Sequence, residues 1–201
     1  GQIHRARLVD GRQVAVKLQY PDIADAVEAE MKLAGLLPNA GPAKRWNFDV
    51  ESYLLALHRN MERELDYLGE AQRQEEFRNG VDVQDLVVPA VHAGLCRPTM
   101  LVQDWEEGAR LEEASAWPLR DRLNIARVLL DTTFRSLFIH GEVHADPHAG
   151  NYRFRPWTDS HKSGLVLYDF GCTVPVPGPA RQSPLKPIPA CAFYPSAAAD
   201  E

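Results

Sequence analysis

Apolar and polar residues alternate in two short runs within the first twenty residues, which is typical of paired strands. The first run ends at Leu8, and the second covers residues 14–18 (Val-Ala-Val-Lys-Leu). Between them lies Asp10-Gly11, a dipeptide that favours a tight hairpin turn. The pattern therefore predicts a β-hairpin, which Pro21 closes.

Helical spacing replaces this alternation over residues 22–37 and again from Asp49 to about Arg78. In the longer segment the apolar residues lie 4, 3, 4, 4 and 3 positions apart, as in one stripe along a helix. These residues are Val50, Leu54, Leu57, Met61, Leu65 and Leu68. We expect one long helix there, separated from the shorter one by a loop at residues 38–42.

The second half of the chain mixes both patterns. Strands are predicted at 86–91, 100–105 and 165–168, with a connector at 106–108. Between the connector and residue 144, a second amphipathic helix has its own apolar stripe, made of Leu119, Leu123, Ala126, Leu130, Phe134 and Leu137.

Proline is concentrated at the end of the chain, where 7 of the 15 prolines fall within residues 175–201. Such a segment sustains neither a helix nor a central strand. We expect the ordered part to end near Thr173 and residues 174–201 to be extended or disordered.

Composition narrows the class of protein. The chain has 201 residues, 45% hydrophobic and 25% charged, which suffices for a globular domain with a sizeable core. A net charge of −6 argues against a general nucleic-acid binder. The cysteines Cys96, Cys172 and Cys191 are odd in number and far apart, which favours a reducing, intracellular compartment over a disulfide framework or a zinc site. No apolar run approaches the roughly 18–20 residues of a membrane span.

The most specific chemical signal spans residues 144–171. Asp146 lies five residues before Asn151, and Asp169 opens an Asp-Phe-Gly sequence. Kinase-type phosphoryl-transfer sites use this spacing: a catalytic Asp, a metal-binding Asn and a second metal-binding Asp. Because ATP phosphates need hard cations with oxygen ligands, the pattern predicts a site for ATP and Mg²⁺.

Upstream charges fit that chemistry, although each has a simpler interpretation. Lys17 in Val-Ala-Val-Lys occupies the position of a phosphate-binding lysine. Taken alone, the motif favours a solvent-facing lysine on an alternating strand, but together with the downstream loop it favours the phosphate-binding role. The acids Glu64, Asp66 and Glu70 on the long predicted helix could form a solvated face near arginines. A lysine partner such as Lys17 would give these acids a function.

Another interpretation treats the loop itself as a metal site. His144, Asp146 and His148 alternate, and in an extended segment they could bind zinc or non-haem iron. Pro147 and Gly150 favour a loop instead, so we expect His144 to support that loop through backbone hydrogen bonds. Cys172 has no base beside it in the sequence and is expected to be a packing residue.

Taken together, the strings at 1–8, 14–21, 64–71, 144–151 and 167–171 closely resemble the ABC1/ADCK/UbiB (AarF) family of atypical kinases. The resemblance implies an α+β, protein-kinase-like two-lobed fold with Mg-ATP between the lobes. It also implies ATPase or small-molecule kinase-like activity, tied to ubiquinone or other prenyl-lipid metabolism. This activity would be located at a membrane, in the bacterial cytoplasm, a mitochondrion or a plastid.

The resemblance also assigns roles. Lys17 would contact the ATP phosphates with Glu70 as its helix partner, Asp146 would be the catalytic aspartate, and Asn151 and Asp169 would bind metal. Glu64 and Asp66 match a Glu-x-Asp signature, with His144 and His148 in the loop motif. The cofactor-binding set is completed by the hinge residues Gln103, Asp104 and Trp105 and by Gly1 and Gln2, the last part of a nucleotide loop.

The chain departs from the family pattern in three places. Of the family's N-terminal motifs it has only Gly1-Gln2, and it has Ala149 where the family often has proline. After Asp-Phe-Gly the family continues with a helical region, whereas this chain is rich in proline. We therefore expect a fold truncated at both ends: an N-lobe-like part over 1–105, a partial C-lobe over 106–173 and the tail 174–201. A catalytically impaired, pseudokinase-like nucleotide-binding scaffold is the alternative. A phosphotransferase of the aminoglycoside/choline type would share the Asp-x₄-Asn loop but not the string at 14–21.

Overall fold

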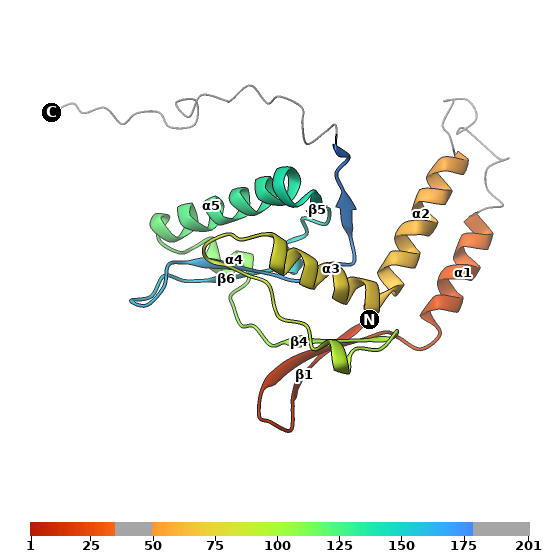
Figure 1. Cartoon of the computed structure of the whole chain (residues 1–201), viewed down its shortest axis with the longest axis horizontal. Helices are drawn as coiled ribbons and strands as arrows, with labels where there is room; N and C mark the ends of the chain where they lie inside the picture. Colours follow the sequence, from red (N-terminus) through yellow and green to blue (C-terminus); the bar gives the residue numbers. More distant parts are fainter. Residues whose placement is uncertain (35–49, 179–201) are drawn as a thin grey trace.

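A computed structural model describes residues 1–34 and 50–178, which form helices around small sheets (Figure 1). The first sheet is antiparallel and has the order β1 (Gln2–Arg7), β2 (Gln13–Leu18), β4 (Met100–Asp104). Gly11 takes a φ of 90° in the β1–β2 turn, a conformation that suits glycine. The predicted hairpin and the strand near residues 100–105 are thus confirmed.

Three helices follow the hairpin along the chain: α1 (Ile23–Ala34), α2 (Val50–Leu65) and α3 (Tyr67–Gly80). Of these, α3 contacts β4 of the first sheet. The prediction of one long helix was wrong, because the chain breaks at Asp66. The Asp66 carboxylate accepts a hydrogen bond from the Gly69 N–H at 2.9 Å and caps the start of α3. The end of the first predicted helix, 35–37, and the predicted loop at 38–42 lie outside the described residues.

The second sheet is mixed and has the order β3 (Leu86–Val87), β7 (Gly164–Leu167), β6 (Tyr152–Arg155). β3 runs parallel to β7, and β6 is antiparallel to it. β3 is shorter than the predicted strand 86–91. β7 is completely buried over its four residues, as the short apolar run indicated. Connections near the sheets include α4 (Leu111–Ala114) and the single turns η2 (Ala93–Leu95) and η4 (Ala149–Asn151).

Helix α5 (Leu119–Arg135) packs on β7 through the face opposite to its apolar stripe. Ile125 and Val128 are buried beside the polar residues Asp121 and Thr132. The Asp121 carboxylate accepts the Trp157 N–H at 2.7 Å, and the Thr132 hydroxyl donates to the Val128 carbonyl. Because these polar groups have partners, burying them costs little. Large residues of the stripe are exposed instead: Leu119 by 60%, Leu123 by 61%, Leu130 by 55% and Phe134 by 53%.

A π-helical turn, η3 (Ser136–His140), leads from α5 to a short antiparallel pair, β5 (Glu142–His144) and β8 (Thr173–Pro175). The described chain therefore continues past Thr173 through β8 to residue 178, and residues 179–201 of the predicted tail lie outside the described residues. The pairing holds the 144–151 segment beside the end of the Asp-Phe-Gly sequence. No helix among residues 1–34 and 50–178 has the length and apolar character to traverse a bilayer.

Candidate functional site

A cavity of about 1040 Å³ is lined by residues of both the first and the second sheet. The first sheet lines it with Ala15, Lys17 and Leu101, and the second half of the chain adds Asn151 and Asp169. Residues separated by more than 130 positions in sequence thus share one space, as the phosphoryl-transfer interpretation requires.

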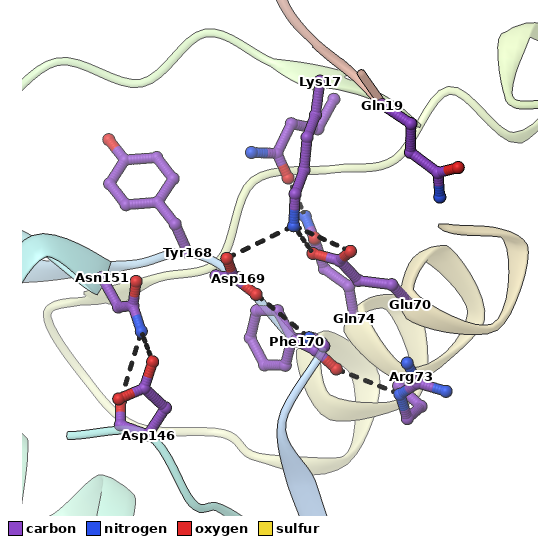
Figure 2. Close-up of polar contacts among 12 residues, drawn as sticks. Lys17, Gln19, Glu70, Arg73, Gln74, Asp146, Asn151, Tyr168, Asp169 and Phe170 are labelled. Carbon is purple, nitrogen blue, oxygen red and sulfur yellow. Dashed lines mark hydrogen bonds and ion pairs between the residues drawn. The ribbon is translucent and has the colours of Figure 1, made fainter. Parts of the chain in front are cut away.

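Lys17 lines this cavity and contacts acidic residues from distant parts of the chain (Figure 2). Its Nζ lies 2.8 and 2.9 Å from the two Glu70 carboxylate oxygens and 3.3 Å from Asp169 Oδ2. The Lys17 side chain is only 18% exposed, so the alternative of a solvent-facing lysine was wrong. Burial lowers the pKa of Lys17, but the carboxylates of Glu70 and Asp169 outweigh burial and raise it above its ordinary value.

Helix α3 presents one face to the site. Glu70 is 2% exposed; burial raises its pKa, and the Lys17 ammonium opposes that shift. One turn further on, Arg73 Nε donates to the Phe170 carbonyl at 3.0 Å (Figure 2). Gln74 is fully buried, and its Nε2 donates to the Pro89 carbonyl at 2.7 Å. Sequence reasoning missed the roles of Arg73 and Gln74, because their partners are distant in sequence.

Asp146 and Asn151 are also in contact with each other. Asn151 Nδ2 donates to Asp146 Oδ2 at 2.8 Å, which orients the Asn151 amide (Figure 2). Asp146 engages the side-chain NH₂ group of Asn151, which leaves the side-chain oxygen, Oδ1, available as a ligand. The other Asp146 oxygen, Oδ1, accepts the His148 backbone N–H at 3.2 Å.

The two histidines of this loop act as structural supports. His144 Nε2 donates to the Asp169 carbonyl at 2.6 Å, and its ring meets Phe170 edge-on at 5.6 Å. His148 Nδ1 accepts the Gly150 N–H. The zinc or iron alternative was wrong, since within the described part of the chain no three His, Cys, Asp or Glu side chains are arranged to hold a metal ion. The expected backbone role of His144 is confirmed.

Asp169 has an unusual backbone, with a φ of 58° in the left-handed region. This conformation lets its Oδ1 accept the Gly171 N–H at 3.1 Å, while Oδ2 is directed toward Lys17. Burial would raise the pKa of Asp169, but Lys17 and the Gly171 N–H outweigh it and hold that pKa below the usual carboxyl value. Asp169 is therefore kept as a carboxylate.

The remaining acids of the predicted signature have different surroundings. Glu64 reaches the Asp-Phe-Gly turn, since a Cβ placed on Gly171 would lie 3.3 Å from Glu64 Oε2. Partial burial and the nearby Asp169 carboxylate raise the pKa of Glu64. Asp66 is exposed and caps α3. Glu64 and Asp66 are both exposed, whereas Glu70 is 2% exposed, so the acidic segment is not one solvated face.

Predicted nucleotide-binding residues divide into two groups. Gln103 and Trp105 line the cavity, and the Gln103 Oε1 accepts from Gln74 at 2.6 Å. Asp104, Gly1 and Gln2 do not line it. The Asp104 carboxylate bonds His92 Nε2 at 2.8 Å instead, and Gly1-Gln2 lies at the start of β1.

Two further residues complete the surroundings. Burial and then Glu64 raise the pKa of the half-buried Cys172 thiol, which agrees with a packing residue rather than a nucleophile. Tyr168, which sequence reasoning missed, lines the cavity, and its hydroxyl donates to the Glu106 carbonyl at 2.7 Å. Burial raises the pKa of Tyr168 to about 12.

The charged and amide groups that line this cavity fit a magnesium–triphosphate group. The Asp169 carboxylate and the free Asn151 amide oxygen are hard ligands of the kind that Mg²⁺ prefers, and both line the cavity. The Lys17 ammonium beside them would meet phosphate oxygens.

Comparisons with known proteins show to which family the chain is similar. A sequence model of the ABC1 atypical kinase-like domain matches residues 1–193. An uncharacterized chloroplastic aarF domain-containing protein kinase of Arabidopsis thaliana is 32% identical over 85% of this chain and 24% of its own length. The mitochondrial atypical kinase coq-8 of Caenorhabditis elegans is 29% identical over 86% of this chain and 23% of its own.

Mouse AarF domain-containing protein kinase 1 is also 29% identical, over 85% of this chain and 33% of its own. The chain thus spans about a quarter to a third of these curated relatives. Among solved structures, Rv3197 of Mycobacterium tuberculosis, in its complex with erythromycin, matches with a TM-score of 0.69 and 33% identity. That match covers 89% of this chain and 44% of the other, and it supports a kinase-like fold.

Proposed function

The chain belongs to the ABC1 atypical kinase-like family, and from this premise we propose that its cavity binds Mg-ATP and supports transfer of the terminal phosphoryl group. The observation that carries the proposal is the position of Lys17, bonded to Glu70 on one side and Asp169 on the other. A buried ammonium beside two carboxylates and an amide oxygen suits a polyphosphate with its cation.

Each residue has a role that its contacts support. Lys17, held by Glu70, would contact phosphate oxygens, and Asn151 with Asp169 would hold Mg²⁺. When bound, the ion would neutralise charge that develops on the transferred group. Asp146 would orient the attacking oxygen through its carboxylate, whose position is fixed by Asn151 and by the His148 N–H.

The acceptor is proposed from the family resemblance alone. We infer a small molecule of the quinone-precursor or prenyl-lipid class, presented at a membrane surface, or water in an ATPase reaction. The named relatives of Arabidopsis and Caenorhabditis are chloroplastic and mitochondrial, which supports an organelle or its bacterial equivalent as the location.

Asp169→Asn tests the proposal, because asparagine tolerates the left-handed backbone and the exchange removes only the charge. Thermal unfolding is measured with and without Mg-ATP. At 100 times Kd, a bound ligand stabilises a protein by about 2.7 kcal/mol, or about 5–10 °C for a chain of this size. The wild type should show this rise, and Asp169→Asn should lose it.

Asp82→Asn is the matched control, since Asp82 is an exposed carboxylate that does not line the cavity. An Asp169→Asn protein that responds to Mg-ATP like the wild type would overturn the assignment. Phosphate release is measured in parallel. Binding without turnover would favour the nucleotide-binding scaffold over the enzyme.

A further inference from the structure

The Asp-Phe-Gly turn is held from outside through two successive backbone carbonyl groups. His144 Nε2, at the end of β5, donates to the Asp169 carbonyl at 2.6 Å. Arg73 Nε donates to the next carbonyl, that of Phe170, at 3.0 Å (Figure 2). Arg73 belongs to α3, the helix whose buried carboxylate holds Lys17. Its hydrogen bond therefore joins the turn that carries Asp169 to the helix that fixes the lysine.

This turn needs outside support because its backbone is strained. Asp169 has a φ of 58°, a left-handed conformation that persists in a residue with a side chain only where the surrounding contacts hold it. In this conformation Asp169 Oδ2 is directed toward Lys17, and Oδ1 accepts the Gly171 N–H at 3.1 Å. The position of the Asp169 carboxylate thus depends on the contacts that hold the backbone of the turn.

The Arg73 guanidinium is enclosed beside the turn. Its Nη2 is buried and has no hydrogen-bond partner within residues 1–34 and 50–178. Its Nη1 lies against Gly69, where an added Cβ would be 2.9 Å away. Burial raises the pKa of the Glu64 carboxyl, and the positive charge of Arg73 is one of those that oppose this shift. Two properties of Arg73 therefore bear on the turn, the hydrogen bond that its Nε donates and its charge.

We propose that Arg73 is a positioning residue for Asp169: its hydrogen bond to the Phe170 carbonyl fixes the Asp-Phe-Gly turn against α3, so that the Asp169 carboxylate and Lys17 keep one relative position. Arg73 does not line the cavity, so it acts through Asp169 and not by contact with a ligand. The inference rests on the proposed function, in which Asp169 binds Mg²⁺.

Two substitutions of similar length separate the hydrogen bond from the charge. In Arg73→Gln the side-chain Nε2 follows the same three carbon atoms as the arginine Nε, so a donor remains and the charge is lost. Arg73→Met has a methyl group at that place and keeps neither. Arg78→Met is the matched control, because Arg78 is an exposed arginine of the same helix whose guanidinium contacts Glu75.

Hydrogen exchange followed by NMR without ligand tests the turn directly. The Gly171 N–H is buried and bonded to Asp169, so it exchanges only when the turn opens. Arg73→Met should raise its exchange rate about 10-fold or more, the effect of losing a hydrogen bond from a charged donor. Arg73→Gln should recover most of the protection, and Arg78→Met should not change it. The Val16 amide, in the middle of β2 and paired on both sides, should exchange as in the wild type.

Calorimetry tests the consequence for the metal site. Arg73→Met should raise the Kd for Mg-ATP about 10-fold, because the carboxylate that binds Mg²⁺ is no longer held in place. Its affinity for ATP in EDTA, where no metal is bound, should equal that of the wild type. Arg73→Gln should again resemble the wild type.

Three results would overturn the inference. Unchanged Gly171 exchange in Arg73→Met would show that the hydrogen bond does not hold the turn. An equal rise at Gly171 and Val16 would show a general loss of stability instead. Equal effects of Arg73→Gln and Arg73→Met would assign the role to the charge. If the wild type did not bind Mg-ATP, the proposed function would fail, whereas the exchange pattern would still decide whether Arg73 holds the turn.

Discussion

The buried ion pair between Lys17 and Glu70 makes a quantitative prediction about stability without ligand. Lys17→Met leaves the Glu70 carboxylate, 2% exposed, with no cation beside it. Removing one partner of a buried pair costs about 3–5 kcal/mol. The Lys17 side chain keeps 18% exposure, so we expect the lower end, about 3 kcal/mol of unfolding free energy.

Glu70→Gln should cost less, about 1–2 kcal/mol, because Lys17 then keeps its contact with Asp169 at 3.3 Å. In the double variant neither charge is left alone. Its loss should therefore be smaller than the sum of the single losses, by about 2 kcal/mol. In thermal unfolding, Lys17→Met alone corresponds to a fall of about 6–12 °C for a chain of this size.

Urea unfolding followed by tryptophan fluorescence, with no nucleotide or Mg²⁺, measures all four proteins of the cycle. The exposed pair Asp10–Arg12 serves as control, with Asp10→Asn and Arg12→Met in a second cycle. That cycle should show no measurable coupling, because exposed pairs are screened by water. Strictly additive effects of Lys17→Met and Glu70→Gln would refute the reasoning.

Three further predictions concern the surroundings of the site. Asp66→Ala should lower the unfolding free energy by about 1 kcal/mol because α3 loses its cap, and Asp66→Asn should not; an equal loss in both would contradict the capping role. The pKa of Glu64 is raised in the folded protein, so ionisation of Glu64 lowers the stability of the fold. This loss of stability is absent at pH values below the pKa of Glu64 in the unfolded chain. It develops as the pH rises through the pKa of Glu64 in the folded protein. Glu64→Gln should therefore raise Tm at pH 8 by no more than about 2 °C, with the gain shrinking toward pH 4; a gain independent of pH would exclude this cause. The raised pKa of Cys172 predicts slower alkylation by iodoacetamide at pH 7 than glutathione shows, measured by mass spectrometry; equal rates would contradict the burial of this thiol.

Sequence patterns predicted the structure correctly wherever it depends on residues that are close together in the chain. The Asp10-Gly11 turn fixes the register of the β1–β2 hairpin, which the alternation then continues. The spacing of Asp146 and Asn151 places both on one loop, and their hydrogen bond follows from that proximity. Hairpin and loop were therefore predicted correctly.

Periodicity failed where a single residue or a distant contact decides the outcome. The apolar stripe of the predicted long helix continues through Leu65 to Leu68, so spacing alone shows no break, yet Asp66 caps a new helix there. In α5 the buried face includes Asp121 and Thr132, whose hydrogen-bond partners make burial acceptable. Hydrophobicity alone therefore identified the opposite face of α5.

Tyr168 and Arg73 were missed for a different reason. Their partners are carbonyl groups, those of Glu106 and Phe170, and a carbonyl exists at every position of a chain. No residue type in the sequence marks such an acceptor, so only the folded arrangement shows it.

The spacing of Glu70, Arg73 and Gln74 on α3 has a mechanical consequence. These residues lie at i, i+3 and i+4 on one helical face, and they hold Lys17, the Phe170 carbonyl and the Pro89 carbonyl. A rotation of α3 about its own axis by one residue, about 100°, would turn all three away together. The contacts are therefore gained or lost as a unit, and the orientation of this one helix determines whether Lys17 is held in place.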